Sequence, residues 1–402
     1  NGKPTLARQF RAAGYRTAAI GKMHFNQPGK PGLHGLETAF TEDVVSTRWR
    51  AESKPKPIPT DVPGRGPWQP FRVPAREWLN ARSEPFARLD YDMRSRFQER
   101  MVREYLAANH TAPFALWVSF QEPHSPFDFP VEDWKHFPPE RFPVPRLGPE
   151  DGWQIPLIFR DLSDAEKQGI IASYYTSARF LDRNVGRVLD LLREFGLEEN
   201  TLVVYTADHG YSLGQHGRFE KHCGYDPALR VPLLMRWPGR IREGEIHDLT
   251  EHVDLSATLL DLLGADPFAV QHGESLRPYL TGGVVTPREW IFSELLENEE
   301  CYARSKQWKY IYCSGKRART DGYRIENPTP GRYRKLYNLE ADPGEFTDVS
   351  EQHPQVVKDF EQRLLARFRE THPEASAEPS QGSAADSLDF YLKPRDAAPV
   401  EG

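Results

Sequence analysis

The sequence has few cysteines, no excess of basic residues and no long apolar run. Its three cysteines, Cys223, Cys301 and Cys313, are too few for a disulfide framework and form no Cys-x-x-Cys pair, so they indicate no redox compartment. Lys and Arg number 52 against 58 Asp and Glu, and the net charge of -6 excludes a nucleic-acid binder that relies on bulk positive charge. The mean hydropathy is -0.66 and no apolar run approaches the roughly 18 residues of a membrane span, so no span is expected.

Proline and aromatic residues are abundant instead. Proline accounts for 35 of 402 residues, and aromatic side chains for 12% of the chain. The aromatic content favours a globular fold over a disordered chain. The prolines gather in residues 51–75 and 123–156, where they exclude long regular elements. Because tryptophan and phenylalanine accompany them, we predict that both stretches are ordered loops that form the walls of a site.

Helix and strand patterns alternate through residues 1–265. Ser163 and Glu166 have the spacing of a capping box, and they begin an apolar stripe of helical period that Gly196 ends. Short apolar runs predict buried strands at residues 15–20, 114–120, 202–206 and 231–237. This alternation predicts an α/β fold in which a central, mostly parallel but mixed sheet lies between helices.

The pattern of predicted elements changes after about residue 285. Short strand-like runs follow, and they predict a small antiparallel sheet that a helix at residues 356–368 closes. The remaining stretch is rich in Ala, Ser, Pro and acidic residues, which is typical of a loosely packed segment. The predicted organisation is therefore a catalytic α/β domain at 1–285, a C-terminal antiparallel-sheet subdomain at 286–372 and a flexible tail at 373–402.

Polar side chains follow three of the predicted strands, and parallel strands would bring them to one edge of the sheet. These residues are Lys22, His24, His124, Asp208, His209 and Lys221. The adjacent carboxylate and imidazole of Asp208 and His209 can bind one cation, although two ligands are too few for a tight site. The alternative interpretation is a strand-to-loop turn with an incidental histidine.

The two lysines would face an anion at this edge, such as a sulfate or phosphate ester. Cations aimed at oxyanion charge stabilise a transition state, and a positioned histidine can act as a general acid. Taken singly, each lysine could equally be a solvated surface charge and each histidine a hydrogen-bonded structural residue. Their joint position after the strands favours a site.

Five segments carry a pattern known from one family, in the expected order from residue 1 to about residue 370. They are GYRTAAIGKMHF (14–25), QEPHSPF (121–127), YYTSARFLDRNVGRVLDLL (174–192), TADHGYSLGQHGRFEKH (206–222) and KLYNLEADPGEFTDV (335–349). The first resembles the second signature of the sulfatases, with Met23 where tryptophan is commoner. Together the segments resemble the sulfatases of the alkaline-phosphatase superfamily, which implies a central mixed sheet, helices on both faces and a smaller C-terminal domain.

The resemblance also implies a metal site. Asp208 would be a ligand of Ca²⁺, with Mg²⁺ or Mn²⁺ as alternatives. His209 stands where relatives carry Asn or His, so it would be a second ligand or would lie beside the metal and the nucleophile.

The remaining roles implied by the resemblance concern the sulfate group. Lys22 and Lys221 would hold its oxygens. His24 would orient or polarise the nucleophile, and His124 would touch the sulfate or the leaving oxygen as a candidate general acid.

Two motifs of the family do not occur in the printed sequence. They are the paired metal-binding aspartates of the first strand and the Cys-x-Pro-Ser-Arg type motif, whose Cys or Ser becomes the formylglycine nucleophile. None of the three cysteines fits that motif. We therefore expect formylglycine in an N-terminal segment outside this sequence, and we predict that the 402-residue chain alone does not turn over sulfate esters.

These inferences predict a sulfatase that cleaves a sulfate monoester of a small molecule or a glycan, with no nucleic-acid partner. Two alternatives stay open: a phosphonate monoester or phosphodiester hydrolase of the same superfamily, and a non-catalytic anion-binding homologue. A periplasmic or secreted location is an expectation, although no signal region stands in the printed sequence. The oligomeric state has no sequence signal.

Overall fold

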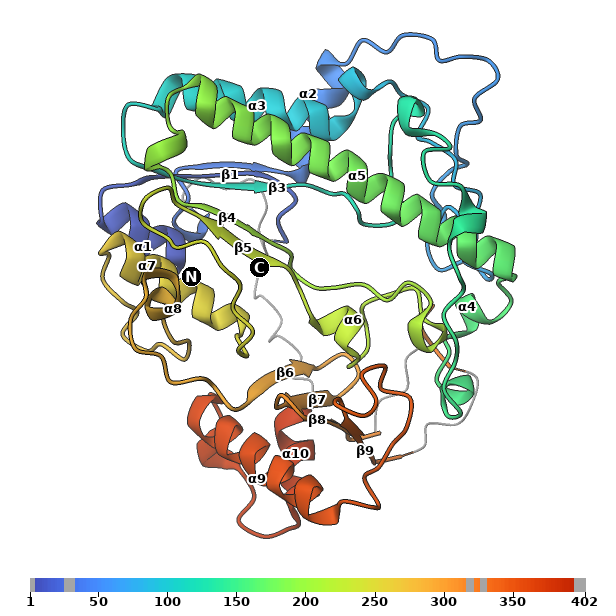
Figure 1. Cartoon of the computed structure of the whole chain (residues 1–402), viewed down its shortest axis with the longest axis vertical. Coiled ribbons are helices and arrows are strands. Elements are labelled where there is room, and N and C mark those ends of the chain that lie inside the picture. Colours follow the sequence, from blue (N-terminus) through green and yellow to red (C-terminus); the bar gives the residue numbers. More distant parts are fainter. Residues whose placement is uncertain (1–3, 25–32, 316–321, 326–330, 394–402) are drawn as a thin grey trace, which may run out of the picture.

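The structure is a computed structural model that describes residues 4–24, 33–315, 322–325 and 331–393 (Figure 1). Its α-helices are α1 (Leu6–Ala12), α2 (Glu42–Glu52), α3 (Arg94–Asn109), α4 (Leu157–Arg160), α5 (Asp164–Glu194), α6 (Asp226–Leu229), α7 (His252–Leu263), α8 (Arg277–Thr281), α9 (Pro354–Thr371) and α10 (Ala384–Leu392). Its strands are β1 (Arg16–Gly21), β2 (Thr38–Thr41), β3 (Phe114–Ser119), β4 (Val203–Thr206), β5 (Leu233–Arg236), β6 (Ile291–Leu295), β7 (Glu300–Arg304), β8 (Trp308–Cys313) and β9 (Tyr333–Asn338).

A parallel sheet of order β2-β1-β3 forms the first half of the α/β part. Successive side chains of a strand point to opposite faces, and β1 follows this rule. Ala18 and Ile20 belong to the apolar cluster that includes residues of α2, α3 and α5, whereas Ala19 packs with Ala7 of α1. Helices therefore cover both faces of β1, as its continuous apolar run predicts.

The second half is an antiparallel pair formed by β4 and β5. Among the described residues no ladder joins this pair to β3, although side chains of β3 and β4 pack against the same apolar cluster. Tyr205, Leu233 and Leu234 are 37%, 38% and 59% exposed. The predicted α/β class with a mixed sheet is confirmed, and the sheet is interrupted between β3 and β4.

The capping box predicted for the longest helix is present at the start of α5. The Ser163 N–H donates to Glu166 Oε2 at 2.9 Å, and the Glu166 N–H donates to Ser163 Oγ at 3.3 Å. The apolar stripe places Ile170 and Phe180 in the core at 0% exposure. In Figure 1 this helix crosses the upper half of the molecule below α3, and its N-terminal end reaches the proline-rich loops.

The two proline-rich stretches contain turns and 3₁₀ helices but no β-strand in the described residues. Buried apolar side chains nevertheless anchor them or the turns that follow, among them Trp78, Phe127 and Phe129. Trp68, by contrast, is 49% exposed.

The C-terminal part is a four-stranded antiparallel sheet of order β6-β7-β8-β9, with α9 and α10 packed on it. The prediction of a flexible tail at 373–402 is wrong for α10, whose Leu388 and Tyr391 are buried in this core. Ser383 caps the helix with Asp386, and the Tyr312 hydroxyl donates to Asp389 Oδ1 at 2.6 Å. Residues 394–402 lie outside the described part.

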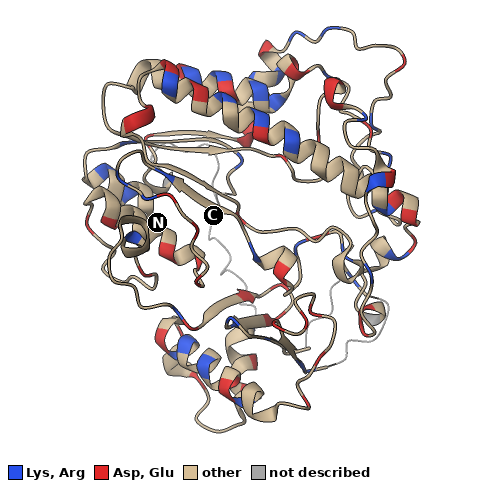
Figure 2. Ribbon diagram, viewed as in Figure 1, with Lys and Arg blue, Asp and Glu red and all other residues tan. Residues whose placement is uncertain are grey.

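Charged side chains of both signs alternate along α3 and α9, so these surfaces show no large field of one sign (Figure 2). Within the described ranges no helix combines the length and the apolar character that crossing a membrane requires.

Candidate active site

The end of β1 brings Lys22 to the edge of the sheet. Its backbone N–H donates to the Ser119 carbonyl of β3 at 2.9 Å. The Gln98 side chain of α3 donates to the carbonyls of Ile20 and Ser119, both at 3.0 Å. Gly21 has φ 115°, and a Cβ there would lie 1.9 Å from the Ser119 oxygen, so only glycine allows this close approach. Lys22 is thereby fixed beside the end of β3.

The loop after β3 carries His124. Its Nδ1 lies 2.8 Å from the Ser125 carbonyl oxygen. Because a carbonyl only accepts hydrogen bonds, Nδ1 carries the proton and Nε2 of the neutral ring is left with its lone pair. Glu122 is buried just before it and accepts a hydrogen bond from Ser95 of α3. Burial raises the pKa of Glu122.

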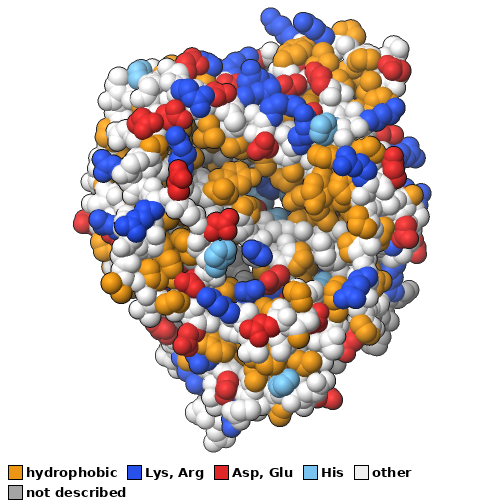
Figure 3. Space-filling model, viewed as in Figure 1, with side chains coloured by type: hydrophobic (Ala, Val, Ile, Leu, Met, Phe, Trp, Pro, Cys, Tyr) orange, Lys and Arg blue, Asp and Glu red, His pale blue; other side chains and the backbone are white. Residues whose placement is uncertain are grey.

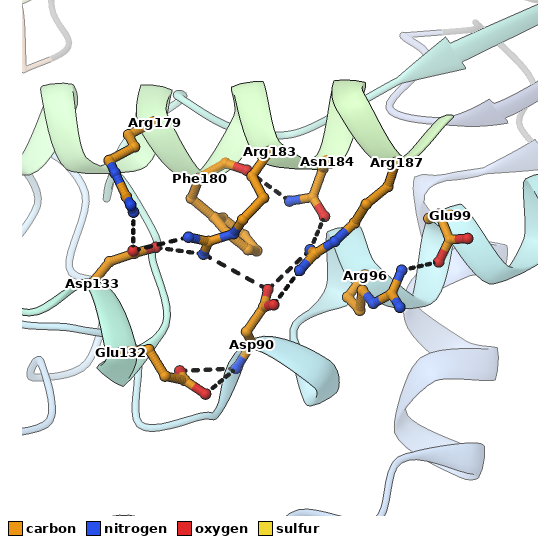
Figure 4. Close-up of polar contacts among 10 residues, drawn as sticks. All are labelled: Asp90, Arg96, Glu99, Glu132, Asp133, Arg179, Phe180, Arg183, Asn184 and Arg187. Carbon is orange, nitrogen blue, oxygen red and sulfur yellow. Dashed lines mark hydrogen bonds and ion pairs between the residues drawn. The ribbon is translucent and has the colours of Figure 1, made fainter. Parts of the chain in front are cut away.

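An ion-pair network fastens this loop to α5 (Figure 4). Asp133, in a 3₁₀ helix at Val131–Asp133, is buried between Arg179 and Arg183, and Arg183 Nη2 lies 2.7 Å from Asp133 Oδ2. One turn farther along the helix, Arg187 pairs with Asp90. Two guanidinium groups compensate one buried carboxylate, so the loop that carries His124 is held against a rigid helix.

Asp208 and His209 follow directly after β4. The His209 N–H donates to Asp208 Oδ1 at 3.0 Å, and His209 Nδ1 lies 2.7 Å from the Gly210 carbonyl. Burial lowers the pKa of His209. Burial opposes ionisation of Asp208, but the charges of His209, Lys22 and Lys221 lower the pKa of its carboxyl. A neutral imidazole therefore stands beside an ionised carboxylate.

The free nitrogen of His209 fits a cation. Nε2 is buried without a hydrogen-bond partner among the described residues, and it lies 3.5 Å from Asp208 Oδ1. With His209 neutral, its Nε2 lone pair and the carboxylate oxygen repel each other, and a divalent cation bound by both would relieve this repulsion, since oxygen and imidazole are both ligands of such cations. The described residues contain no group of three or more His, Cys, Asp and Glu that could hold a metal, so this pair would be part of a larger set.

The loop that carries Lys221 folds back on itself after β4. The Gly210 N–H donates to the Ala228 carbonyl and the Ser212 N–H to the Glu220 carbonyl, both at 2.8 Å. The Glu220 side chain is buried and pairs with Arg218. These contacts fix the residue that precedes Lys221.

Electrostatic interactions that shift pKa values link five of the six predicted residues, Lys22, His124, Asp208, His209 and Lys221. Burial, followed by the charges of Lys22 and Lys221, lowers the pKa of His124 to about 4. Burial also lowers the pKa of Lys22, with Asp208 acting in the opposite direction and Lys221 adding to the effect. Figure 3 shows a hollow near the centre of this face, where Lys or Arg and His side chains lie among hydrophobic ones.

His24 is the exception. Its side chain is exposed, and no contact joins it to the other five within the described ranges. Its predicted role beside the nucleophile stays a prediction.

Sequence reasoning missed the groups that support this site. Gln98 and Ser95 lie on α3, and their contacts to β1 and to Glu122 depend on packing between distant segments. Asp133 lies in a proline-rich stretch, where no periodic pattern marks it as a partner of a helix. The one readable signal was the spacing of Arg179, Arg183 and Arg187, four residues apart on one helix face.

The depressed pKa of His124 predicts a pH-dependent stability. Unfolded histidine binds a proton below about pH 6.5, whereas folded His124 stays neutral down to about pH 4. In that window the unfolded state holds more protons, so the free energy of unfolding is expected to fall as the pH is lowered from about 6.5 to about 4. Denaturant unfolding at pH 7 and pH 5 measures this loss.

The variant His124→Gln is expected to lose less stability between these two pH values than the wild type. His247→Gln serves as the control, because the His247 side chain is 82% exposed. Equal losses in the wild type and in His124→Gln would contradict the prediction.

Comparison with known families supports the sequence motifs. A family model described as Sulfatase matches residues 1–265, and one described as N-sulphoglucosamine sulphohydrolase, C-terminal, matches residues 214–370. The first covers more than half of the chain. The chain therefore belongs to the sulfatase family.

Two named relatives match nearly the whole chain, and a third matches about a third of it. A choline-sulfatase of Rhizobium meliloti is 29% identical over 91% of this chain and 70% of its own length. Arylsulfatase K of Canis lupus familiaris is 26% identical over 90% of this chain and 67% of its own length. An N-acetylglucosamine-6-O-sulfatase of Bacteroides thetaiotaomicron is 36% identical, over 31% of this chain and 22% of its length. The chain thus spans about two thirds of the length of the first two.

Solved structures share the fold. The phosphonate monoester hydrolase of Agrobacterium radiobacter superposes with a TM-score of 0.69 at 22% identity, covering 90% of this chain and 79% of that one. A structure in complex with its substrate D-glucosamine-2-N,6-O-disulfate superposes with a TM-score of 0.65 at 16% identity, covering 93% and 84%. At these identities the likeness concerns the fold alone.

Proposed function

We propose that this chain forms the anion-binding part of an enzyme that hydrolyses sulfate monoesters. The observation that carries the proposal is the pair Lys22 and Lys221, both half-buried and neither in an ion pair with another described residue. Two ammonium groups next to a neutral His124 form a cationic cluster that would bind an anionic tetrahedral group. Positive charge gathered at one place attracts such a substrate despite a net charge of -6.

Asp208 and His209 would hold a divalent cation, Ca²⁺ or alternatively Mg²⁺ or Mn²⁺, which would supply Lewis-acid stabilisation of negative charge. The family's formylglycine would supply the nucleophile. Within this chain, Lys22 and Lys221 would bind the sulfate oxygens and stabilise the charge that develops on them. Their preset positions also orient the ester for displacement.

His124 would deliver the proton to the leaving oxygen. In the free site its pKa of about 4 keeps it neutral at physiological pH. A bound sulfate ester would offset the positive charges of the lysines and would raise the pKa of the ring, because an anion nearby favours imidazolium. Protonation of His124 would thus be coupled to substrate binding.

The open strand edges support a further part of the proposal. The outer edges of β3 and β4 are unpaired among the described residues, and apolar side chains nearby are exposed. A further strand between them would unite the two half-sheets and would end next to Lys22, His124 and Asp208. We propose that such a strand, from a segment outside the printed sequence, brings the nucleophile and the remaining metal ligands.

A substrate panel tests the proposed reaction. The full-length protein is assayed on an aryl sulfate, choline sulfate, a glucosamine 6-O-sulfate, a phosphodiester and a phosphonate monoester. We expect kcat/KM for the best sulfate ester to exceed that for the phosphorus esters by at least about 10-fold, which corresponds to about 1.4 kcal/mol of barrier. The best sulfate then defines the substrate class.

The other outcomes identify the alternatives. A preference for the phosphodiester or phosphonate would overturn the sulfatase assignment within the same superfamily, and no turnover of any ester would indicate a non-catalytic anion-binding homologue. The 402-residue chain alone is expected to show no multiple turnover, and turnover by it would contradict the need for a nucleophile from outside.

A further inference from the structure

The two faces of the C-terminal sheet pack against different parts of the chain. Along β8, Tyr310 and Tyr312 belong to the cluster that includes α9 and α10, whereas Ile311 belongs to a cluster with residues 223–229. The alternation follows from the period of two along a strand. One face of the sheet therefore builds the C-terminal core, and the other supports the segment that follows Lys221.

A buried ion pair joins this second face to the start of α6. Lys309 Nζ lies 2.8 Å from Asp226 Oδ1 and 2.6 Å from Glu345 Oε1, and its side chain is 0% exposed. The Asp226 N–H also donates to Glu345 Oε2 at 2.8 Å. Because a buried charge is stable only with its partners in place, this arrangement fixes where Asp226 lies on the sheet.

Two more contacts lie closer to Lys221. The Asn298 side chain, in the β6–β7 turn, donates to the His222 carbonyl at 3.1 Å. Gly224 lies against the ring of Tyr302, and a Cβ on this glycine would come within 2.1 Å of Tyr302 Cε1. The backbone therefore touches the sheet from His222 to Asp226, directly after Lys221.

We propose that the C-terminal antiparallel sheet positions Lys221 for the anion. Asn298, Tyr302 and Lys309 are positioning residues, since they hold the backbone after Lys221 and do not belong to the charged cluster itself. The inference rests on the proposed function, in which Lys221 binds sulfate oxygens. Displacing a binding group by about 1 Å can lower a rate by about 10²-fold, so this support matters for the reaction.

Gly224→Ala in the full-length protein tests the contact with Tyr302. The added methyl group has no room against the ring, so the segment must shift and kcat/KM for the sulfate ester is expected to fall by about 10-fold to 10²-fold. Gly186→Ala on α5 is the matched control, because its Cβ would meet nothing within 4 Å.

A second measurement does not depend on turnover. Acetic anhydride labels the lysines in the presence or absence of inorganic sulfate, and mass spectrometry gives the protection at Lys221 and at Lys22. In Gly224→Ala we expect sulfate protection to be lost at Lys221 and kept at Lys22. If the wild type shows protection but no sulfatase activity, the proposed function fails while positioning is still tested.

Asn298→Ala provides a milder variant that removes the hydrogen bond to the His222 carbonyl. It is expected to weaken the protection of Lys221 and to lower kcat/KM several-fold, and it decides the matter if thermal unfolding shows that Gly224→Ala is not folded. The proposal would be overturned if a folded Gly224→Ala protein had the kcat/KM of the wild type and its protection at Lys221. If Gly224→Ala does not fold, the same result in Asn298→Ala would overturn it.

Discussion

Replacing Lys221 by alanine in the full-length enzyme is expected to lower kcat/KM for a sulfate ester by about 10²–10³-fold, the range known for removal of one group that stabilises an oxyanion. The Lys221 side chain is half-buried, and its charge acts on His124 together with that of Lys22, so under the proposed function it would contact the bound anion. Steady-state kinetics on the best substrate of the panel measure the effect.

The stability of Lys221→Ala is expected to stay near that of the wild type. Lys221 makes no ion pair with another described residue, and its removal relieves repulsion with Lys22. Lys306→Ala is the control for loss of a lysine, because the Lys306 side chain is 61% exposed and pairs with Asp248. Unchanged kinetics in Lys221→Ala would mean that this lysine is only a surface charge.

Asp208→Asn is expected to have a still larger effect, a loss of about 10³-fold or more in kcat/KM. The substitution keeps the shape of the side chain but removes the negative charge that would hold the cation, and a bound metal ion supplies several kcal/mol of transition-state stabilisation. It also leaves the two lysines without the carboxylate that compensates them. Kinetics and metal content of the purified protein are measured together.

Asp164→Asn is the control for this substitution, because the Asp164 side chain is 78% exposed at the start of α5. An Asp208→Asn protein that keeps its metal and its activity would favour the alternative interpretation, in which Asp208 only accepts the His209 N–H of a turn at 3.0 Å. Loss of activity with full metal content would place Asp208 outside the metal site.

Short-range patterns predicted the parts of the fold that local physics determines. The apolar runs predicted β1, β3 and β4 within one or two residues, and the Ser163–Glu166 pair predicted the start of α5. The candidate site residues were readable because four of them follow directly after strands that end at one edge. Their positions after the predicted strands were sufficient to propose that they lie close together, without any distance between their side chains.

Elements that depend on distant partners could not be predicted in this way. Residues 38–52 form β2 and α2, but their apolar positions are few and α2 has no side-chain cap at Thr41. The polar composition around α10 hid a helix whose capping box, Ser383 with Asp386, was present in the sequence. Lys309 is the clearest case. From the sequence, a lysine in a strand is expected to point to solvent, and only the structure shows that Asp226 and Glu345 pair with it in the interior.

The interruption between β3 and β4 has a consequence for handling the protein. Unpaired strand edges are templates on which other chains form hydrogen bonds, and natural proteins protect such edges. Here one edge of β3 and one edge of β4 are unpaired among the described residues, and Leu233 and Leu234 of the neighbouring β5 are exposed. We therefore expect the 402-residue chain alone to associate with other chains through these edges, and we expect a peptide that pairs with them to reduce this association.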